Sequence, residues 1–429
     1  GRTALENNTT GVDNTATGRA TMSQNTTGGY NTAVGALALL ANTTASSNTA
    51  VGYLSLTANT TGAFNVAIGN SALATSVTGY FQTAVGYGAL TNSNYTTNVY
   101  AYNTAVGYNA GAANTTGKVT AFGASVLQAN TTGINNTAVG GATDAAGASL
   151  QNNTTGGHNT ALGNVSLRSN TTASFNSAVG YSAMAQNTTG ASNSAFGYAA
   201  LTACTTGSSH TAVGSQALLA TTTGTGNVAM GTTAGRYITT AGNNTCVGVN
   251  AGGLNGVNTT LTTGHQNVLI GYGASTSAAA GTRQIVIGGD YATGKGNNTA
   301  FIAEGSGAYQ GNNSSSWSTT SDRRIKKNIV DSTVGLVEIN QLQVRNFEYR
   351  TKDEITEVDP NAAIDKTGVQ VGVIAQEIQA ILPNCVKEES TGVLSVDPDN
   401  LTWHLIKAIQ ELSATNDALE ARITALEGA

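Results

Sequence analysis

The chain has little charge, little proline and few aromatic side chains for its length. Of its 429 residues, 10% are charged, 6% are aromatic and 3 are proline, whereas 53 are glycine. Low charge combined with few large hydrophobic residues is typical of low complexity, but disordered chains are usually rich in charge and proline. The sequence therefore favours a repeat architecture that buries small residues in thin layers.

Other absences exclude whole classes of function. No run of about 20 apolar residues occurs, so we expect no membrane span. Cys204, Cys246 and Cys385 lie far apart in the sequence, which predicts neither a disulfide framework nor a metal site. The histidines are scattered as well, and we expect no metal and no cofactor. A net charge of −5 argues against a nucleic-acid partner.

A motif of the type Asn-Thr-Ala-Val-Gly recurs through the first three quarters of the chain, mostly at intervals of about 17 residues, which marks a repeat architecture. Alternation in a short strand would place Asn, Ala and Gly on one face and Thr and Val on the other. One such unit cannot bury its apolar face alone, so we expect stacked coils that form a rod of roughly 70–80 Å. Sixteen copies begin at Asn14, Asn31, Asn48, Asn65, Gln82, Asn103, Val119, Asn136, Asn159, Asn176, Asn193, His210, Asn227, Asn244, Asn267 and Gln284.

The repeat is similar to the head repeats of trimeric bacterial adhesins, which share an A-[VI]-G-x-x-[AS] core. This resemblance implies a left-handed parallel β-roll in each chain, with three chains packed side by side. A β-helix interwoven from three chains is the alternative. The predicted fold class is therefore mainly β, with a β-solenoid body in which one repeat of about 17 residues makes one coil.

Three intervals between motifs are longer than the period, and insertions in solenoids form surface loops. The long intervals run from Gln82 to Asn103, from Asn136 to Asn159 and from Asn244 to Asn267. The first insertion contains Tyr95, Tyr100 and Tyr102, and tyrosine provides a platform for sugars or for a flat protein epitope. We expect either a receptor-binding loop or, alternatively, aromatic side chains that cover a seam between protomers.

The charge changes abruptly at Ser321. Residues 1–320 carry 7 basic and 5 acidic residues, whereas residues 321–429 carry 11 and 18. We predict a repeat shaft over 1–290, a closing loop or linker over 291–320 with Trp317 as an end cap, a small mixed α/β domain over 321–400, and a helix over 401–429.

Three blocks of the charged segment carry a second resemblance. The first is Ser321–Ile329, the second is Gly372–Pro383 with the sequence GVIAQEIQAILP, and the third is Leu394–Asp397 followed by a helix with an AIQEL core at 408–412. In this order they resemble the C-terminal intramolecular chaperone of phage tail fibres and tailspikes, the endosialidase-type or S74 peptidase family. Pro398 stands where that family more often has an aromatic residue.

The resemblance implies that the chaperone is cut from the finished fibre. Ser321 Oγ would attack the carbonyl carbon of Thr320, Lys326 would accept the hydroxyl proton, and the Thr320–Ser321 bond would break. Residues five apart on a helix point about 140° apart, so we expect either an irregular segment or a site shared between chains. The plain alternative is that Ser321 caps a helix that begins with basic residues.

The C-terminal residues repeat apolar side chains at alternating intervals of four and three. This heptad pattern predicts a coiled coil, and Ile at a with Leu at d favours a dimer, whereas the chaperone family implies a trimer, which we adopt. The predicted seam is Leu405, Ile409, Leu412, Asn416, Leu419, Ile423 and Leu426.

These observations predict a structural and binding protein. We expect a homotrimeric tail-fibre-like appendage of a virion tail, which self-cleaves once and binds a glycan or protein receptor on a host cell surface. Its partners would be itself, the receptor and other tail or baseplate proteins. The alternatives are a trimeric bacterial surface adhesin, a polysaccharide depolymerase and an ice-binding solenoid.

Overall fold

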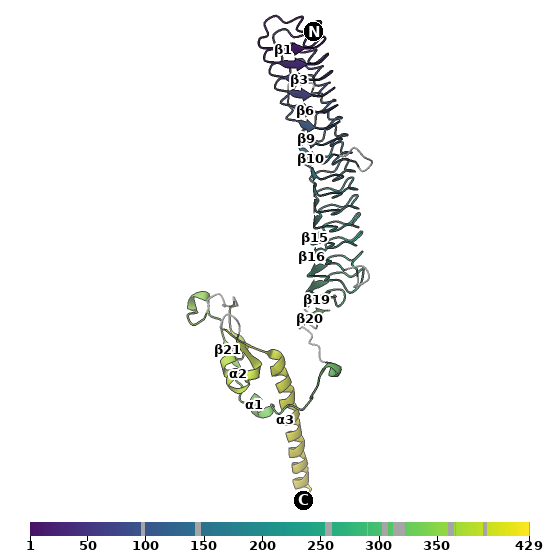
Figure 1. Cartoon of the computed structure of the whole chain (residues 1–429). Coiled ribbons are helices and arrows are strands. Elements are labelled where there is room, and N and C mark those ends of the chain that lie inside the picture. Colours follow the sequence, from purple (N-terminus) through teal and green to yellow (C-terminus); the bar gives the residue numbers. More distant parts are fainter. Residues whose placement is uncertain are drawn as a thin grey trace. The chain divides into compact units, whose positions relative to one another are not determined.

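The computed structural model describes residues 1–95, 99–141, 147–253, 260–289, 291–302, 308–311, 322–358, 364, 366–388 and 393–428. These residues divide into two units, Gly1–Thr320 and Ser321–Ala429. The first is a β-solenoid and the second is a small α/β unit (Figure 1).

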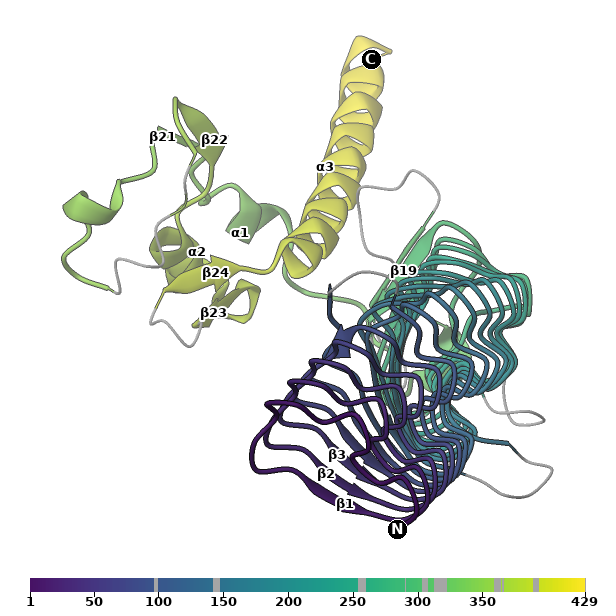
Figure 2. The same ribbon diagram turned by 90° about the horizontal axis from the view of Figure 1, so that it is seen from above.

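Each motif forms one short strand, and successive strands stack in parallel. Thr32 pairs with Thr49 and Ala33 with Ala50, so that equivalent residues of neighbouring coils lie directly opposite each other. The view from above shows the coils stacked one behind another (Figure 2). The predicted mainly β fold is confirmed, with one coil for each sequence repeat, and the coils of a single chain pair with each other, as a β-roll requires.

The ladder strands are β1 (Thr15–Thr17), β2 (Thr32–Val34), β3 (Thr49–Val51), β4 (Val66–Ile68), β6 (Thr83–Val85), β8 (Thr104–Val106), β9 (Val119–Phe122), β10 (Asn136–Val139), β11 (Thr160–Leu162), β12 (Ser177–Val179), β13 (Ser194–Phe196), β14 (Thr211–Val213), β15 (Val228–Met230), β16 (Thr245–Val247), β17 (Val268–Ile270), β18 (Ile285–Ile287), β19 (Thr299–Ile302) and β20 (Ala308–Gly311). A separate parallel pair joins β5 (Gly79–Tyr80) to β7 (Val99–Tyr100), which belongs to the first insertion.

The core of the solenoid is built from small side chains and one large side chain per coil. The central residue of each ladder strand from β2 to β18, usually an alanine such as Ala33, is fully buried, while the flanking Thr32 and Val34 point outward. Leu39 supplies the large side chain from a left-handed backbone position with φ 51°, a conformation that costs a leucine about 1–2 kcal/mol. A Cβ on Gly35 would lie 2.5 Å from the carbonyl oxygen of Gly52, so the coils stack too closely there for any other residue.

Two ladders of buried polar side chains run along the stack. In the first, Asn42 Nδ2 donates to Asn25 Oδ1 at 2.6 Å and to the carbonyl of Ala45 at 3.0 Å. In the second, which contains the first residue of each motif, the backbone N–H of Asn48 donates to Asn31 Oδ1 at 2.9 Å. Because an amide can both donate and accept, most of these buried polar groups are satisfied by the neighbouring coil, which stabilises the stack. Asn59 Oδ1 is an exception and has no hydrogen-bond partner.

His210 occupies an asparagine position of the second ladder and makes the same contacts. Its Nε2 lies 2.7 Å from the carbonyl oxygen of Gly224, and its Nδ1 accepts from the backbone N–H of Asn227 at 3.2 Å. Only a neutral ring with the proton on Nε2 satisfies both contacts. Burial lowers the pKa of His210.

Acid is expected to destabilise the shaft through His210. The unfolded chain binds the imidazole proton at a higher pH than the folded chain, so stability falls as the pH drops below about 6.5. His210→Asn should reduce the loss of Tm between pH 7 and pH 5, whereas the matched change His158→Asn, at an exposed histidine, should not. An unchanged pH profile in His210→Asn would contradict this assignment.

The repeat continues further than the sequence indicates. The predicted linker 291–320 contains β19, which pairs in parallel with β18, and β20, which pairs with β19 in the antiparallel sense. The interpretation as a loop is wrong for Thr299–Ile302, because this segment keeps the strand alternation, with Phe301 buried in the inward position. Trp317, the predicted end cap, lies outside the described residues.

The second unit has short elements around a small core, followed by one long helix. The core contains Ile378, Leu382 and Cys385. Pro398 is the first residue of the long helix, where its fixed φ is favourable, and Asp397 caps that helix by accepting from the N–H of Asp399. The elements are η1 (Arg323–Ile325), α1 (Leu336–Ile339), β21 (Arg345–Phe347), η2 (Lys352–Glu354), β22 (Gln370–Gly372), α2 (Ala375–Ile381), η4 (Pro383–Cys385), β23 (Val386–Glu388), β24 (Leu394–Val396) and α3 (Pro398–Glu427).

Candidate functional site

The predicted cleavage segment starts with one turn of 3₁₀ helix and then becomes extended. Asp322 caps η1 by accepting from the N–H of Arg324 at 2.8 Å, and the Arg324 guanidinium binds the same carboxylate at 2.6 Å. These hydrogen bonds lower the pKa of Asp322. The cap is thus Asp322 rather than Ser321, which was the plain alternative. Thr320 and Ser321 lie outside the described residues, so the dyad stays a prediction.

Lys326, the predicted general base, is the first extended residue after η1, with φ −106° and ψ 143°. Its side chain is exposed. The same stretch presents apolar side chains to solvent, because Ile325 is 70% exposed and Val330 is 86% exposed. Within the single chain, no described surface covers this stretch.

The second sequence block forms α2, which anchors β21. Ile378 and Leu382 point into the core, while Glu377 binds the guanidinium of Arg345 through two hydrogen bonds at 3.0 and 3.2 Å. The two residues are more than a third exposed, so this pair contributes orientation more than stability.

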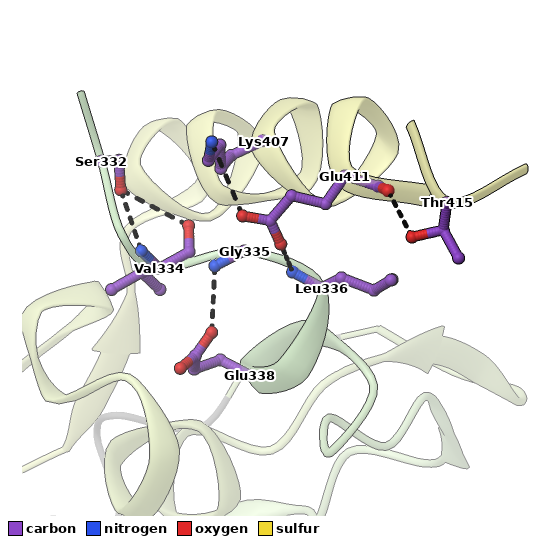
Figure 3. A network of polar contacts seen from close by, with 8 residues as sticks. All are labelled: Ser332, Val334, Gly335, Leu336, Glu338, Lys407, Glu411 and Thr415. Carbon is purple, nitrogen blue, oxygen red and sulfur yellow. Dashed lines mark hydrogen bonds and ion pairs between the residues drawn. The ribbon is translucent and has the colours of Figure 1, made fainter. Parts of the chain in front are cut away.

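The third block fastens α3 to the beginning of α1 (Figure 3). Glu411 Oε2 accepts from the backbone N–H of Leu336 at 2.8 Å, and its other carboxylate oxygen lies 3.6 Å from Lys407 Nζ. Glu338 accepts from the N–H of Gly335 at 2.9 Å, which lowers the pKa of the Glu338 carboxyl group. The glutamate of the AIQEL core therefore caps another helix from across the unit.

The predicted tyrosine loop is divided by the structure. Tyr95 is only 4% exposed, and its hydroxyl donates to the Gly117 carbonyl at 2.9 Å and accepts from Asn103 Nδ2 at 3.0 Å. Its assignment to a receptor-binding surface is therefore wrong, because its long side chain completes the interior polar ladder. Tyr100 and Tyr102 are exposed, at 60% and 59%.

Two phenylalanines that were not predicted as site residues pack against the exposed tyrosines. Phe64 stacks on Phe81 at 5.1 Å between ring centroids, and Phe81 stacks on Tyr102 at 5.6 Å. Tyr100 lies 5.6 Å from Phe81. Phe64, Phe81 and Tyr102 each precede the first residue of a motif, and this shared position is the signal that would have revealed them. We call Phe64, Phe81, Tyr100 and Tyr102 the aromatic cluster.

A family model described as chaperone of endosialidase matches residues 321–387. The match begins at the predicted scissile serine and includes the first two sequence blocks. Residues 321–387 form a chaperone-of-endosialidase domain. The third block and α3 follow this domain, outside the matched residues.

Two relatives are similar in sequence to part of this chain. A "Probable tail fiber protein" of Escherichia phage Phieco32 is 31% identical over 138 residues, which is 29% of this chain and 18% of the relative. "Myelin regulatory factor homolog 1" of Caenorhabditis elegans is 28% identical over 103 residues, 24% of this chain and 11% of the relative. The chain thus spans less than a fifth of the length of either relative, and its similarity to them is regional.

The helix α3, which follows the chaperone-of-endosialidase domain, has one buried side and one exposed side. His404 and Ala408 are buried against the domain. The predicted seam is exposed instead, from 42% at Leu405 to 77% at Leu426. The helix is present over the predicted range, and the coiled coil stays a prediction.

Neither a metal site nor a membrane span accompanies the chaperone-of-endosialidase domain within the part of the chain that the structure describes. No three His, Cys, Asp or Glu side chains lie close enough there to hold a metal ion. None of the described helices is both long and apolar enough to cross a membrane.

Proposed function

We propose that the chain is a homotrimeric, tail-fibre-like appendage of a virion tail. It assembles through its C-terminal chaperone, is then cut between Thr320 and Ser321, and binds a host cell surface. The observation that carries this proposal is a chaperone-of-endosialidase domain that begins where a long β-solenoid ends. The similarity to a probable phage tail fibre protein supports the same assignment.

Cleavage would proceed through an ester. Ser321 Oγ attacks the carbonyl carbon of Thr320 while Lys326 Nζ accepts the hydroxyl proton. The carbon–nitrogen bond breaks, the Ser321 nitrogen takes up a proton, and Thr320 is left esterified to Oγ. Water then hydrolyses the ester, which gives a Thr320 carboxylate and regenerates the Ser321 hydroxyl. Each chain would react once, because its only substrate is its own peptide bond.

Lys326 needs a second surface to act as a base. A lysine amine becomes neutral near pH 7 when it is desolvated or lies beside other cations. Lys326 is exposed in the single chain, and the neighbouring Ile325 and Val330 are exposed as well. A neighbouring protomer that covers these apolar side chains would also desolvate Lys326, so cutting would depend on assembly.

The exposed seam of α3 supports assembly into a trimer. Its apolar side chains are exposed to solvent in one chain, whereas in a parallel coiled coil they would pack as knobs into holes. Joined helices would hold three shafts at high local concentration and in register while the slow, non-local solenoid forms. Removal of the chaperone would then leave a finished rod that unfolds only slowly.

Mass analysis of the purified wild-type chain tests this proposal. We expect one fragment that begins at Ser321 and one that ends at Thr320, together with a native mass of three chains for the shaft. A chain that folds, assembles and stays at full length would refute self-cleavage. A shaft with the native mass of a single chain would refute the trimer.

We place host-surface binding at the aromatic cluster. Tyrosine is frequent among the residues that dominate binding interfaces, and these exposed rings pack against one another. The double variant Tyr100→Ala/Tyr102→Ala should weaken binding to host cells at least about tenfold. Tyr181→Ala/Tyr198→Ala is the matched control, because those tyrosines are also stacked and exposed. Equal loss in both variants, or in neither, would move the receptor site elsewhere.

A further inference from the structure

One side of the shaft presents an unbroken line of apolar side chains. Each ladder strand from β2 to β19 points one such residue outward, directly above its equivalent in the preceding coil. The line, here the outer apolar column, consists of Val34, Val51, Ile68, Val85, Val106, Phe122, Val139, Leu162, Val179, Phe196, Val213, Met230, Val247, Ile270, Ile287 and Ile302.

The column remains continuous where the period of the sequence does not. At the three insertions Val85 still pairs with Val106, Val139 with Leu162 and Val247 with Ile270. The column therefore keeps its register across all three long intervals.

The chemistry of this side suits a dry contact. The parallel outward column, two residues before each member of the outer apolar column, contains only Thr, Ser, Val, Ile and Ala, so neither column carries a charge from β2 to β19. Protein interfaces exclude charge from their centres in the same way. A glycan would need polar partners that the outer apolar column does not offer.

The exposed apolar area is a large part of what a stable interface needs. The exposed members range from 36% at Ile270 to 46% at Met230 and Ile302, and the rest are half-buried. Burying a whole side chain of this kind contributes about 1.5–3 kcal/mol, or roughly 60–120 Å² of apolar surface, so a third of that over the column is roughly 300–600 Å². Stable interfaces bury about 800 Å² per partner, so the column would supply about half of such a contact.

The geometry selects the partner. Sixteen coils at about 4.8 Å per coil make a straight line of about 75 Å, roughly twice the diameter of a 100-residue domain. A second rod with the same rise per coil would match it at every level. We propose that the outer apolar column is the seam of the shaft, where the columns of three copies face each other. This inference rests on the proposed trimer and adds which side of the coil makes it.

Disulfide trapping tests the seam. Leu162→Cys and Phe196→Cys place thiols in the column, and Thr189→Cys places one on an exposed turn outside it. Two cysteines are linked only when their Cβ atoms approach within about 4.5 Å. The native Cys204 and Cys246 are buried, and burial raises their pKa values to about 11 and about 12, so they should stay unreacted.

We expect mild oxidation of either column variant to link two chains of each trimer, and Thr189→Cys to stay unlinked. Native mass is measured on the same samples. A three-chain mass without linkage in Leu162→Cys and Phe196→Cys overturns the seam and leaves the trimer. A one-chain mass overturns both, and thermal hysteresis of that monomer would assign the column to ice. Linkage through Thr189→Cys alone would place the seam on another side.

Discussion

Ser321→Ala is expected to keep the chain at its full length of 429 residues, under conditions in which the wild type separates into residues 1–320 and 321–429. Alanine removes the only oxygen of the side chain, so no ester can form with the carbonyl carbon of Thr320. The solenoid should still assemble, because the substitution changes neither a ladder residue nor the seam of α3. Intact mass and the N-terminal sequence of each fragment provide the measurement.

Lys326→Ala should slow the same reaction by roughly 10²–10⁴-fold, the usual effect of losing a general base. Lys327→Ala is the matched control, because it removes the same charge from the next exposed residue and should cut like the wild type. Cleavage of Ser321→Ala at the same bond would show that an external protease makes the cut. Normal cutting by Lys326→Ala would remove Lys326 from the reaction.

A mixing experiment can locate the two groups in one chain or in two. If Ser321 of one protomer meets Lys326 of another, trimers that contain both Ser321→Ala and Lys326→Ala chains should regain partial cutting. Only the chain that retains Ser321 should then be cut. If both groups act within one chain, mixed trimers should remain uncut. The exposure of Lys326 in the single chain favours the first result.

Periodicity made the shaft predictable from sequence. A parallel stack in register requires only that equivalent residues recur at the coil length, and Asn31, Asn48 and Asn65 do so. The alternation of small and branched residues predicted which residues share a face, and the structure shows that the face with Asn31 and Ala33 is the buried one. The same pattern could not predict that Tyr95 is buried. In the sequence, a tyrosine in an insertion gives no sign of whether its hydroxyl will face solvent or bind a buried carbonyl.

The C-terminal unit was predictable in a different way. Its blocks identified the domain, but their physical roles depend on contacts between residues far apart in sequence. Glu411 reaches the N–H of Leu336 across 75 positions, and no local pattern specifies that pairing. The extent of the shaft was similarly hidden, because Asn298-Thr299-Ala300 is followed by Phe301-Ile302 instead of Val-Gly. The strand β19 also pairs with β18 one residue out of the register that this triplet indicates.

The buried asparagine ladder that contains Asn170 is expected to contribute strongly to the free energy of unfolding. Asn170 is fully buried, donates to Asn153 Oδ1 at 2.7 Å and to the Ala173 carbonyl at 3.1 Å, and accepts from Asn187 Nδ2 at 3.0 Å. In Asn170→Ala the Asn153 oxygen loses its partner and one Asn187 donor hydrogen loses its acceptor. Each buried group left unsatisfied costs about 1–3 kcal/mol.

We therefore expect Asn170→Ala to lower the free energy of unfolding by about 3 kcal/mol per chain. In a trimer the loss would apply to each of the three chains. The exposed neighbour Thr172→Ala should change it by less than about 0.5 kcal/mol. Denaturant unfolding followed by circular dichroism measures both. The chain itself carries Cys204 at a ladder position, 4.0 Å from Asn187 Oδ1, so one weak rung is tolerated and the variant should fold. Equal stability of the two variants would mean that the ladder aligns the coils without holding them together, and that the stacked leucines alone stabilise the rod.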